Sequence, residues 1–446
     1  MSNSCSWTRR AAAILCLSLL SFATACGSAA ASGTNDGTSS DGEVAPALYD
    51  GTGSTTAQSR RARDYRNVAA APTAAPTAPA APSPVPAAAS PGTTTASLRG
   101  TNLIGMEGGY GFNTTSGPVP DTDYAVHSNS IVDYLASKNV NVIRLLFSWE
   151  RMQSTLNGPI PAATSGNYKA YFDDFKRIVD YATNVKGMTV IMEPWQAGTS
   201  GGVGGPSWRG NRVGDGVVTN AHFADFWSKM AATFASNPRA VIGLVNEPNS
   251  MSTMTWFATA QTAITAIRAT GFAGDIHVPG NGWSGAGSWT DAGVDAATPQ
   301  RSNAYGWLNA RGPGLALLDP LGRLVVGVHT YADADAGGST TSVLSGTVTR
   351  ERVKVAVDWA RANGLKVFVG EVGMYAAATN ASANWSSFVS YLDANSDTLT
   401  GFAWWGCGKP GWWDDIAASG GGHFSITPKG TTDTVNMNLI EGSFLP

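Results

Sequence analysis

The sequence predicts an α/β protein, a (β/α)8 barrel of the TIM type, preceded by a signal or lipoprotein peptide and a disordered linker rich in Pro, Ala and Thr. From residue 98 onward, eight short apolar runs alternate with helix-like segments, which favours a closed barrel over an open sheet. Two of these runs, at 241–249 and 366–373, deliver a glutamate, Glu247 and Glu371. Barrel enzymes place their chemistry at the carboxyl ends of their strands, so the pattern also predicts where the site lies.

The expected strands are short and rich in Val, Ile and Leu, as buried parallel strands are. Pro248 cannot donate to a sheet ladder, so the fourth strand stops there. In chain order, the eight strands are expected at 102–106, 141–147, 188–192, 241–247, 276–279, 324–329, 366–373 and 401–405.

The expected helices carry apolar residues on one face and end at residues that favour a C-cap. Gly271 follows one helix and Asn363-Gly364 another. The helices are expected at 129–138, 168–185, 221–236, 252–270, 349–362 and 384–392. From Trp412 onward the chain is rich in Gly, and no eighth helix can be placed there.

The N-terminal residues are typical of an export signal. Arg9-Arg10 precede the apolar run 11–22, which is too short to span a bilayer. Ala23-Thr-Ala-Cys26 resembles a lipoprotein processing site with Cys26 as the lipidated residue, and ordinary signal-peptidase cleavage nearby is the alternative. We therefore expect a secreted protein or a cell-surface or outer-membrane lipoprotein of a bacterium, with any lipid anchor as its only membrane contact.

Residues 27–97 predict a disordered spacer, and residues 98–446 the barrel. Seven prolines and no charged residue lie between 68 and 97, a composition that cannot bury enough surface to fold. The net charge of −3 gives no reason to expect a nucleic-acid partner. Low charge with 15 Trp suits neutral ligands that stack on aromatic rings. We expect a monomer.

Glu247 and Glu371 together suggest glycoside hydrolysis. A retaining glycosidase needs one carboxylic acid to protonate the leaving oxygen and one carboxylate to attack, about 5 Å apart. Strands four and seven lie nearly opposite each other in an eight-stranded barrel, so their terminal glutamates can face each other across a sugar. Each glutamate could instead cap a helix or pair with an arginine, and for either alone that reading would be preferred.

Several motifs in chain order resemble glycoside hydrolase family 5, in its fungal-type endoglucanase branch. The resemblance spans about residues 98 to 408. Its motifs are Asn220–Trp227, Asn246-Glu247-Pro248, Pro279–Trp283, Ser284–Gly287, His329-Thr-Tyr331, Gly370-Glu371 and Trp404-Trp405.

The resemblance implies a role for each matching residue. Glu247 would be the acid/base and Glu371 the nucleophile. Asn246 would bind the 2-hydroxyl of the sugar being cleaved. Arg144 would lie under Glu371 and hold its pKa low.

Strands six and eight supply further residues. Tyr331 would bond Glu371, and His329 would contact the sugar or the acid/base. Trp405 would be the platform under the reacting sugar, with Trp404 in the core.

The end of strand three departs from the family pattern. Family members usually carry an Asp-x-His-Asn-like run there, whose His contacts the reacting sugar. This chain reads Met192-Glu-Pro-Trp-Gln196, so Trp195 could stack on the sugar or Gln196 could donate to a hydroxyl. Glu193 would support Arg144 or contact the sugar.

The other tryptophans in expected loops are candidates for sugar subsites or for plugs under long loops. Trp283 is the first candidate for a subsite. The rest are Trp149, Trp208, Trp289, Trp412 and Trp413.

The sequence therefore predicts a retaining endo-β-1,4-glucanase that acts on a polysaccharide (β-glucan) without a cofactor or metal. The alternatives are a mannanase or another β-1,4-glycanase, because such barrels share their glutamates, and a non-catalytic carbohydrate-binding barrel. A metal-dependent hydrolase is discounted because the chain has five His and no His-x-His pair.

Overall fold

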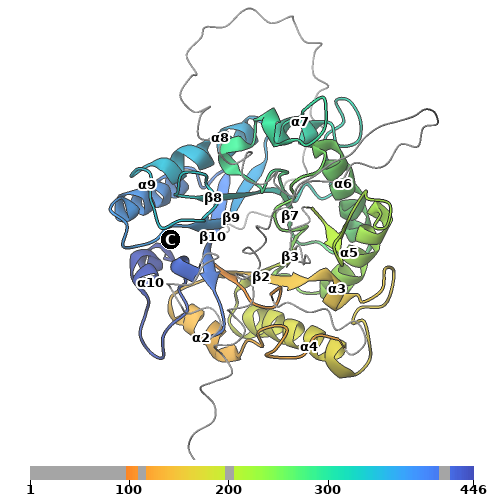
Figure 1. The fold of residues 1–446 in the computed structure, drawn as a ribbon, viewed down its shortest axis with the longest axis horizontal. Coiled ribbons are helices and arrows are strands. Elements are labelled where there is room, and N and C mark those ends of the chain that lie inside the picture. The colour runs from red at the N-terminus through yellow and green to blue at the C-terminus, as the bar shows by residue number, and fades with distance from the viewer. Residues whose placement is uncertain (1–96, 109–116, 196–204, 411–421, 446) are drawn as a thin grey trace, which may run out of the picture. The chain divides into compact units, whose positions relative to one another are not determined.

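Eight parallel strands close into a barrel (Figure 1). The structure, a computed structural model, describes residues 97–108, 117–195, 205–410 and 422–445. In barrel order the strands are β1 (Leu98–Leu103), β2 (Val142–Ser148), β3 (Thr189–Trp195), β6 (Ala240–Gly243), β7 (Ile276–Pro279), β8 (Leu324–Tyr331), β9 (Lys366–Gly373) and β10 (Leu399–Cys407). The (β/α)8 barrel predicted from the sequence is confirmed.

Helices surround the barrel in Figure 1. They are α2 (Asn129–Ser137), α3 (Trp149–Met152), α4 (Gly166–Asp180), α5 (Asn220–Phe234), α6 (Thr253–Ala269), α7 (Asn303–Leu308), α8 (Val348–Ala362), α9 (Ala381–Ala394) and α10 (Val435–Ile440). A π-helical turn, Tyr181–Val185, continues α4, and the hairpin β4 (Ser207–Trp208) and β5 (Asn211–Arg212) follows β3. Short 3-10 turns lie at Ala286–Ser288, Ala292–Val294, Gly422–Phe424 and Glu441–Ser443.

The largest error in the expected strands concerns β1, which begins at Leu98 rather than at residue 102. Its first residues include Arg99, Gly100 and Thr101, so no apolar run marks them. Gly100 is required there because a Cβ would lie 1.7 Å from the Val142 carbonyl oxygen of β2. The last helix, α10, is only six residues long, which explains why no helical period could be found for it.

Apolar side chains fill the bottom of the barrel and polar ones lie above them. Val142, Ile191, Val241, Val325, Phe368 and Ala403 form a separate buried cluster. Alternate residues of a strand share a face, so Arg144 and Glu193 form the next layer toward the mouth. The fourth strand has Gly243 at this level, where a Cβ would lie 2.1 Å from Glu193 Oε2. A glycine is thus needed for the Glu193 side chain to fit inside the barrel.

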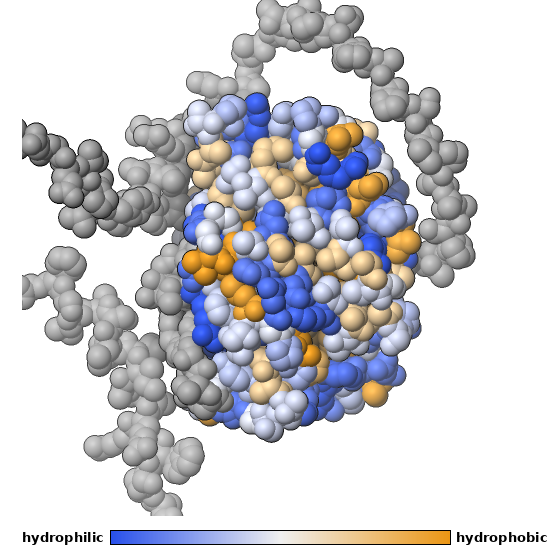
Figure 2. All heavy atoms as spheres, turned by 90° about the vertical axis from the view of Figure 1, so that its right-hand side faces the viewer, coloured by the Kyte–Doolittle hydropathy of each residue, from blue (hydrophilic) through white to orange (hydrophobic). Residues whose placement is uncertain are grey.

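The outer surface mixes polar and apolar residues. On the face drawn in Figure 2, where α5 and α6 lie in Figure 1, the coloured residues show no extended apolar area. Within the described ranges, no helix is long and apolar enough to cross a membrane. The expected signal 1–26 with Cys26, and the spacer 27–97 apart from Ser97, lie outside the described residues.

Candidate active site

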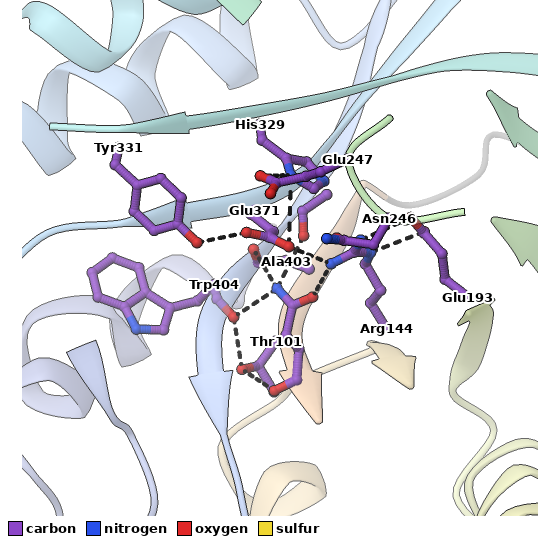
Figure 3. Close-up of polar contacts among 12 residues, drawn as sticks. Thr101, Arg144, Glu193, Asn246, Glu247, His329, Tyr331, Glu371, Ala403 and Trp404 are labelled. Carbon is purple, nitrogen blue, oxygen red and sulfur yellow. Dashed lines mark hydrogen bonds and ion pairs between the residues drawn. The ribbon is translucent and has the colours of Figure 1, made fainter. Parts of the chain in front are cut away.

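The predicted polar residues converge at the carboxyl end of the barrel (Figure 3). Arg144 comes from β2, His329 and Tyr331 from β8, and Glu371 from β9. Asn246 and Glu247 lie just beyond β6. The backbone N–H of Asn246 donates to the Pro194 carbonyl of β3 at 2.9 Å. Strands far apart in sequence thus bring these side chains together.

Arg144 lies at the centre of the site and is 1% exposed. Its Nε and Nη2 form a fork on Glu193 at 2.9 and 2.8 Å, and Nη1 donates to Glu371 Oε1 at 2.9 Å. Its remaining donors reach Asn102 Oδ1 and Asn246 Oδ1, both at 2.6 Å. The five N–H groups of the guanidinium therefore all have protein partners. Arg144 lies beside Glu371 as expected, and Glu193 supports Arg144.

Glu371 accepts hydrogen bonds from two side chains. Besides Arg144, Tyr331 Oη donates to Glu371 Oε2 at 2.6 Å, which is the contact predicted from the sequence. The prediction that Arg144 holds the pKa of Glu371 low was wrong in direction. Burial disfavours the charged form and raises the pKa of Glu371 above 4.5, although Arg144 and Tyr331 oppose this rise. The carboxylate that Arg144 does shift downward is Glu193, where its charge and hydrogen bonds outweigh the burial that raises the pKa.

Glu247 has the pKa of a proton donor. Burial raises the pKa of its carboxyl to about 8, so it holds a proton at neutral pH. Its backbone is in the left-handed region, with φ of 44°, which is costly for a residue other than glycine and is found mainly where function requires it.

His329 lies between the two glutamates. Its Nδ1 is 2.8 Å from Glu247 Oε1 and 3.6 Å from Glu371 Oε1. Burial lowers the pKa of His329 to about 4, so the ring is neutral and positions the acid without adding charge. Of the two contacts expected for His329, the structure shows the one with Glu247.

Oxygens of the two carboxyl groups approach each other closely at the mouth of the barrel. One oxygen each from Glu247 and Glu371, together with a ring nitrogen of His329, lie within 4.8 Å of one another. Retaining enzymes separate their carboxyls by about 5–5.5 Å and inverting enzymes by about 6.5–9.5 Å. The same three atoms could in principle hold a metal ion. Because the Arg144 cation already lies against Glu371, the three side chains suit an acid and a nucleophile better than they suit a bound metal cation.

The aromatic candidates divide into exposed and buried rings. Trp283 is 46% exposed and its amide donates to the Pro248 carbonyl at 3.0 Å, so it flanks Glu247. Trp405 is only 8% exposed and stacks on Trp195, with ring centroids 5.5 Å apart and planes at 30°. Trp404 is fully buried and its indole N–H donates to the Phe424 carbonyl at 2.8 Å, which confirms that it belongs to the core.

Three candidates from the sequence lie outside the described residues, namely Gln196, Trp412 and Trp413. Trp149 and Trp289 are buried plugs rather than subsites. Trp208 is partly exposed, and the Arg209 guanidinium lies 4.7 Å from the centre of its ring.

Asn102 was missed by sequence reasoning. It accepts from Arg144 and donates to the Gly370 carbonyl at 2.9 Å, so it holds both Arg144 and the backbone next to Glu371. The available signal was a polar residue near the end of the first strand, the same signal that identified Glu247.

Comparison with known proteins agrees with this geometry. The family model for cellulases, glycosyl hydrolase family 5, matches residues 96–408, more than half of the chain. The chain belongs to glycosyl hydrolase family 5.

Relatives of this family 5 chain include fungal and structurally characterised enzymes. Endoglucanase 1 of Robillarda sp. (strain Y-20) is 32% identical over 305 residues, which are 65% of this chain and 72% of that protein. Endo-beta-1,4-glucanase A of Emericella nidulans is 29% identical over 320 residues, covering 71% and 84%. The structure of XacCel5A in complex with cellopentaose is 28% identical and has a TM-score of 0.66, covering 78% of this chain and 99% of that one.

Proposed function

We propose that this family 5 chain is a retaining endo-β-1,4-glucanase that hydrolyses β-1,4-glucan by double displacement. The observation that carries the proposal is a pair of carboxyls with oxygens within 4.8 Å of each other, the partly exposed Glu247, which is protonated, and the buried Glu371, which is held by two donors. Relatives named endo-beta-1,4-glucanase, and a structural relative that binds cellopentaose, support the substrate.

In the first step, Glu247 gives its proton to the glycosidic oxygen while a Glu371 oxygen attacks the anomeric carbon. The bond between that carbon and the leaving oxygen breaks, and a covalent glycosyl-enzyme forms. Arg144 donates a hydrogen bond to Asn246 Oδ1, which orients the side-chain amide of Asn246. The NH2 group of that side chain would donate to the sugar 2-hydroxyl.

In the second step, the Glu247 carboxylate removes a proton from water. The water oxygen attacks the anomeric carbon from the face that the leaving group occupied, and the bond to Glu371 breaks. Negative charge returns to Glu371, where Arg144 and Tyr331 donate to its two oxygens. Two inversions give net retention.

A reducing-end assay over β-1,4-glucan, β-mannan, xyloglucan and xylan tests the proposal. We expect the highest rate on β-1,4-glucan and a first product with the β configuration by NMR. The end of β3 lacks the histidine of the family pattern, so another β-1,4-glycan is the alternative substrate, and a higher rate on mannan would establish it. If no β-glycan is cleaved, the chain is a carbohydrate-binding barrel instead.

The raised pKa of Glu247 predicts the pH profile. Glu247 must be protonated for the first step, so kcat/KM should fall as the pH rises through about 8. Glu371 must be ionised, so the acid limb should lie above pH 4.5, because the pKa of Glu371 is raised.

A 2,4-dinitrophenyl cellobioside serves as the control for that profile, because its leaving group needs no acid. With Glu247→Gln, the first step on this substrate should proceed and show no limb near pH 8. A limb that persists in this variant would assign it to another group.

We also propose export of the chain, on the residues of its N-terminal segment. Mass spectrometry of the mature N-terminus in wild type and Cys26→Ala distinguishes lipidation of Cys26 from release into the medium.

A further inference from the structure

The ring expected to form the floor of the cleft is covered by another ring. Trp405 is 8% exposed and its indole stacks on that of Trp195. Trp195 ends β3 and remains partly exposed. A sugar needs an open indole face on which to stack, and of these two rings Trp195 has more surface available.

The strand order shows which part of the mouth the pair occupies. Trp195 lies on β3 and Trp405 on β10, and β2 and β1 lie between these two strands in the barrel. The stack therefore bridges the rim above β1 and β2. Ser148 of β2 is the register partner of Trp195. Trp283 follows β7, which lies across the barrel from β1.

The positions of the two glutamates indicate on which side of the barrel mouth each part of the substrate lies. The leaving sugar must lie next to the acid, Glu247, and Trp283 is joined to the segment after Glu247 by its bond to the Pro248 carbonyl. The sugars that stay attached to Glu371 must then extend toward the opposite rim, where Trp195 and Trp405 stack.

We propose that Trp195 is a specificity-determining residue that forms the aromatic floor for the retained sugars, and that Trp405 supports it from below. This inference rests on the proposed glucanase function. Stacking holds the Trp195 ring in one orientation before substrate arrives, so that less order has to be created on binding. The end of β3 carries no histidine in this chain, and Trp195 there presents an apolar ring that accepts the flat, equatorially substituted face of a β-1,4-linked glucose.

The test is the affinity for cellopentaose in a Glu371→Gln background, measured by calorimetry. Adding Trp195→Ala should weaken binding about tenfold, the equivalent of one lost aromatic contact. Trp195→Phe should keep affinity within about threefold of the parent because a ring remains. Tyr305→Ala, on the outer helix α7 and 39% exposed, is the matched control and should leave affinity unchanged.

Steady-state kinetics supply a second readout with Glu371 intact. Trp195→Ala should raise KM about tenfold on cellopentaose with kcat changed less than about threefold, as expected when binding is lost equally from ground and transition states. A general loss of structure would instead lower kcat, and Trp195→Phe would not restore KM.

Three results would overturn the inference. Trp195→Ala that binds as tightly as the parent, or more tightly, would make Trp195 a cover over the true platform, Trp405. Trp195→Phe as weak as Trp195→Ala would exclude stacking. A wild type that hydrolyses no β-glucan, with a Glu371→Gln parent that binds no cellopentaose, would remove the proposed function together with the inference.

Discussion

Replacing Glu371 by alanine is expected to lower kcat on β-1,4-glucan by roughly 10⁴-fold or more, because no covalent intermediate can form. Glu371 is 2% exposed and accepts from both Arg144 and Tyr331, so the variant keeps these two donors and loses the whole attacking carboxylate. The measurement is single-turnover hydrolysis of an aryl cellobioside, with circular dichroism to show that the fold is kept.

Added azide separates the roles of the two glutamates. In Glu371→Ala, azide can enter from the face where the nucleophile stood and should give the α-glycosyl azide. In Glu247→Ala, the glycosyl-enzyme still forms with a good leaving group, and azide from the opposite face should give the β-glycosyl azide. The reverse pair of products would exchange the two assignments, and an inverted product from wild type would exclude Glu371 as nucleophile.

Replacing Arg144 by methionine is expected to destabilise the fold by about 3–5 kcal/mol, the typical cost of removing one partner from a buried ion pair. Arg144 is 1% exposed and is the partner of both Glu193 and Glu371, which are themselves buried. Without it, two carboxyls lie in the barrel with no cation against them.

The stability that Arg144→Met loses should depend on pH. In wild type, burial raises the pKa of Glu193, but Arg144 outweighs this and lowers it. This group therefore stabilises the fold above the unfolded pKa, and the contribution is lost as the pH falls through the folded pKa. In Arg144→Met, burial alone raises the pKa of both carboxyls, so the variant gains stability as they protonate. The difference between the two proteins should be large at pH 7.5 and smaller at pH 5.

The loss of stability is measured by thermal melting of four proteins: wild type, Arg144→Met, Glu193→Gln and the double variant. Glu193→Gln keeps Arg144 with Glu371 and should cost less than Arg144→Met. In the double variant only Glu371 lacks a cation, so part of the stability should return. A melting temperature for Arg144→Met within about 2 °C of wild type at pH 7.5 would show that the buried guanidinium is not needed to hold the mouth together.

Much of the fold could be predicted because its signals are local. Most strands are apolar runs bounded by turn residues, and β7 and β9 have the predicted limits. The start of β1 could not be predicted, since Gly100 is there to make room for the Val142 carbonyl of the next strand. Such a requirement depends on a residue 42 positions away.

The candidate site could be named from the sequence for a related reason. Residues at strand ends reach one rim in any parallel barrel, so Glu247, His329, Tyr331 and Glu371 were expected together before their distances were known. Asn102 was not expected, because its role depends on being within reach of Arg144 and Gly370.

The sequence by itself therefore determined the barrel, the identity of the two glutamates and the family, since periodicity and ordered motifs are properties of the chain. Only the tertiary structure decided the protonation of the two glutamates and which of the two stacked tryptophan rings is buried. Whether burial or Arg144 controls the pKa of Glu371 depends on how deeply the carboxyl is buried, and burial prevails. Which of Trp195 and Trp405 keeps more exposed surface depends on how the two rings stack above β1 and β2, and Trp405 is the buried one.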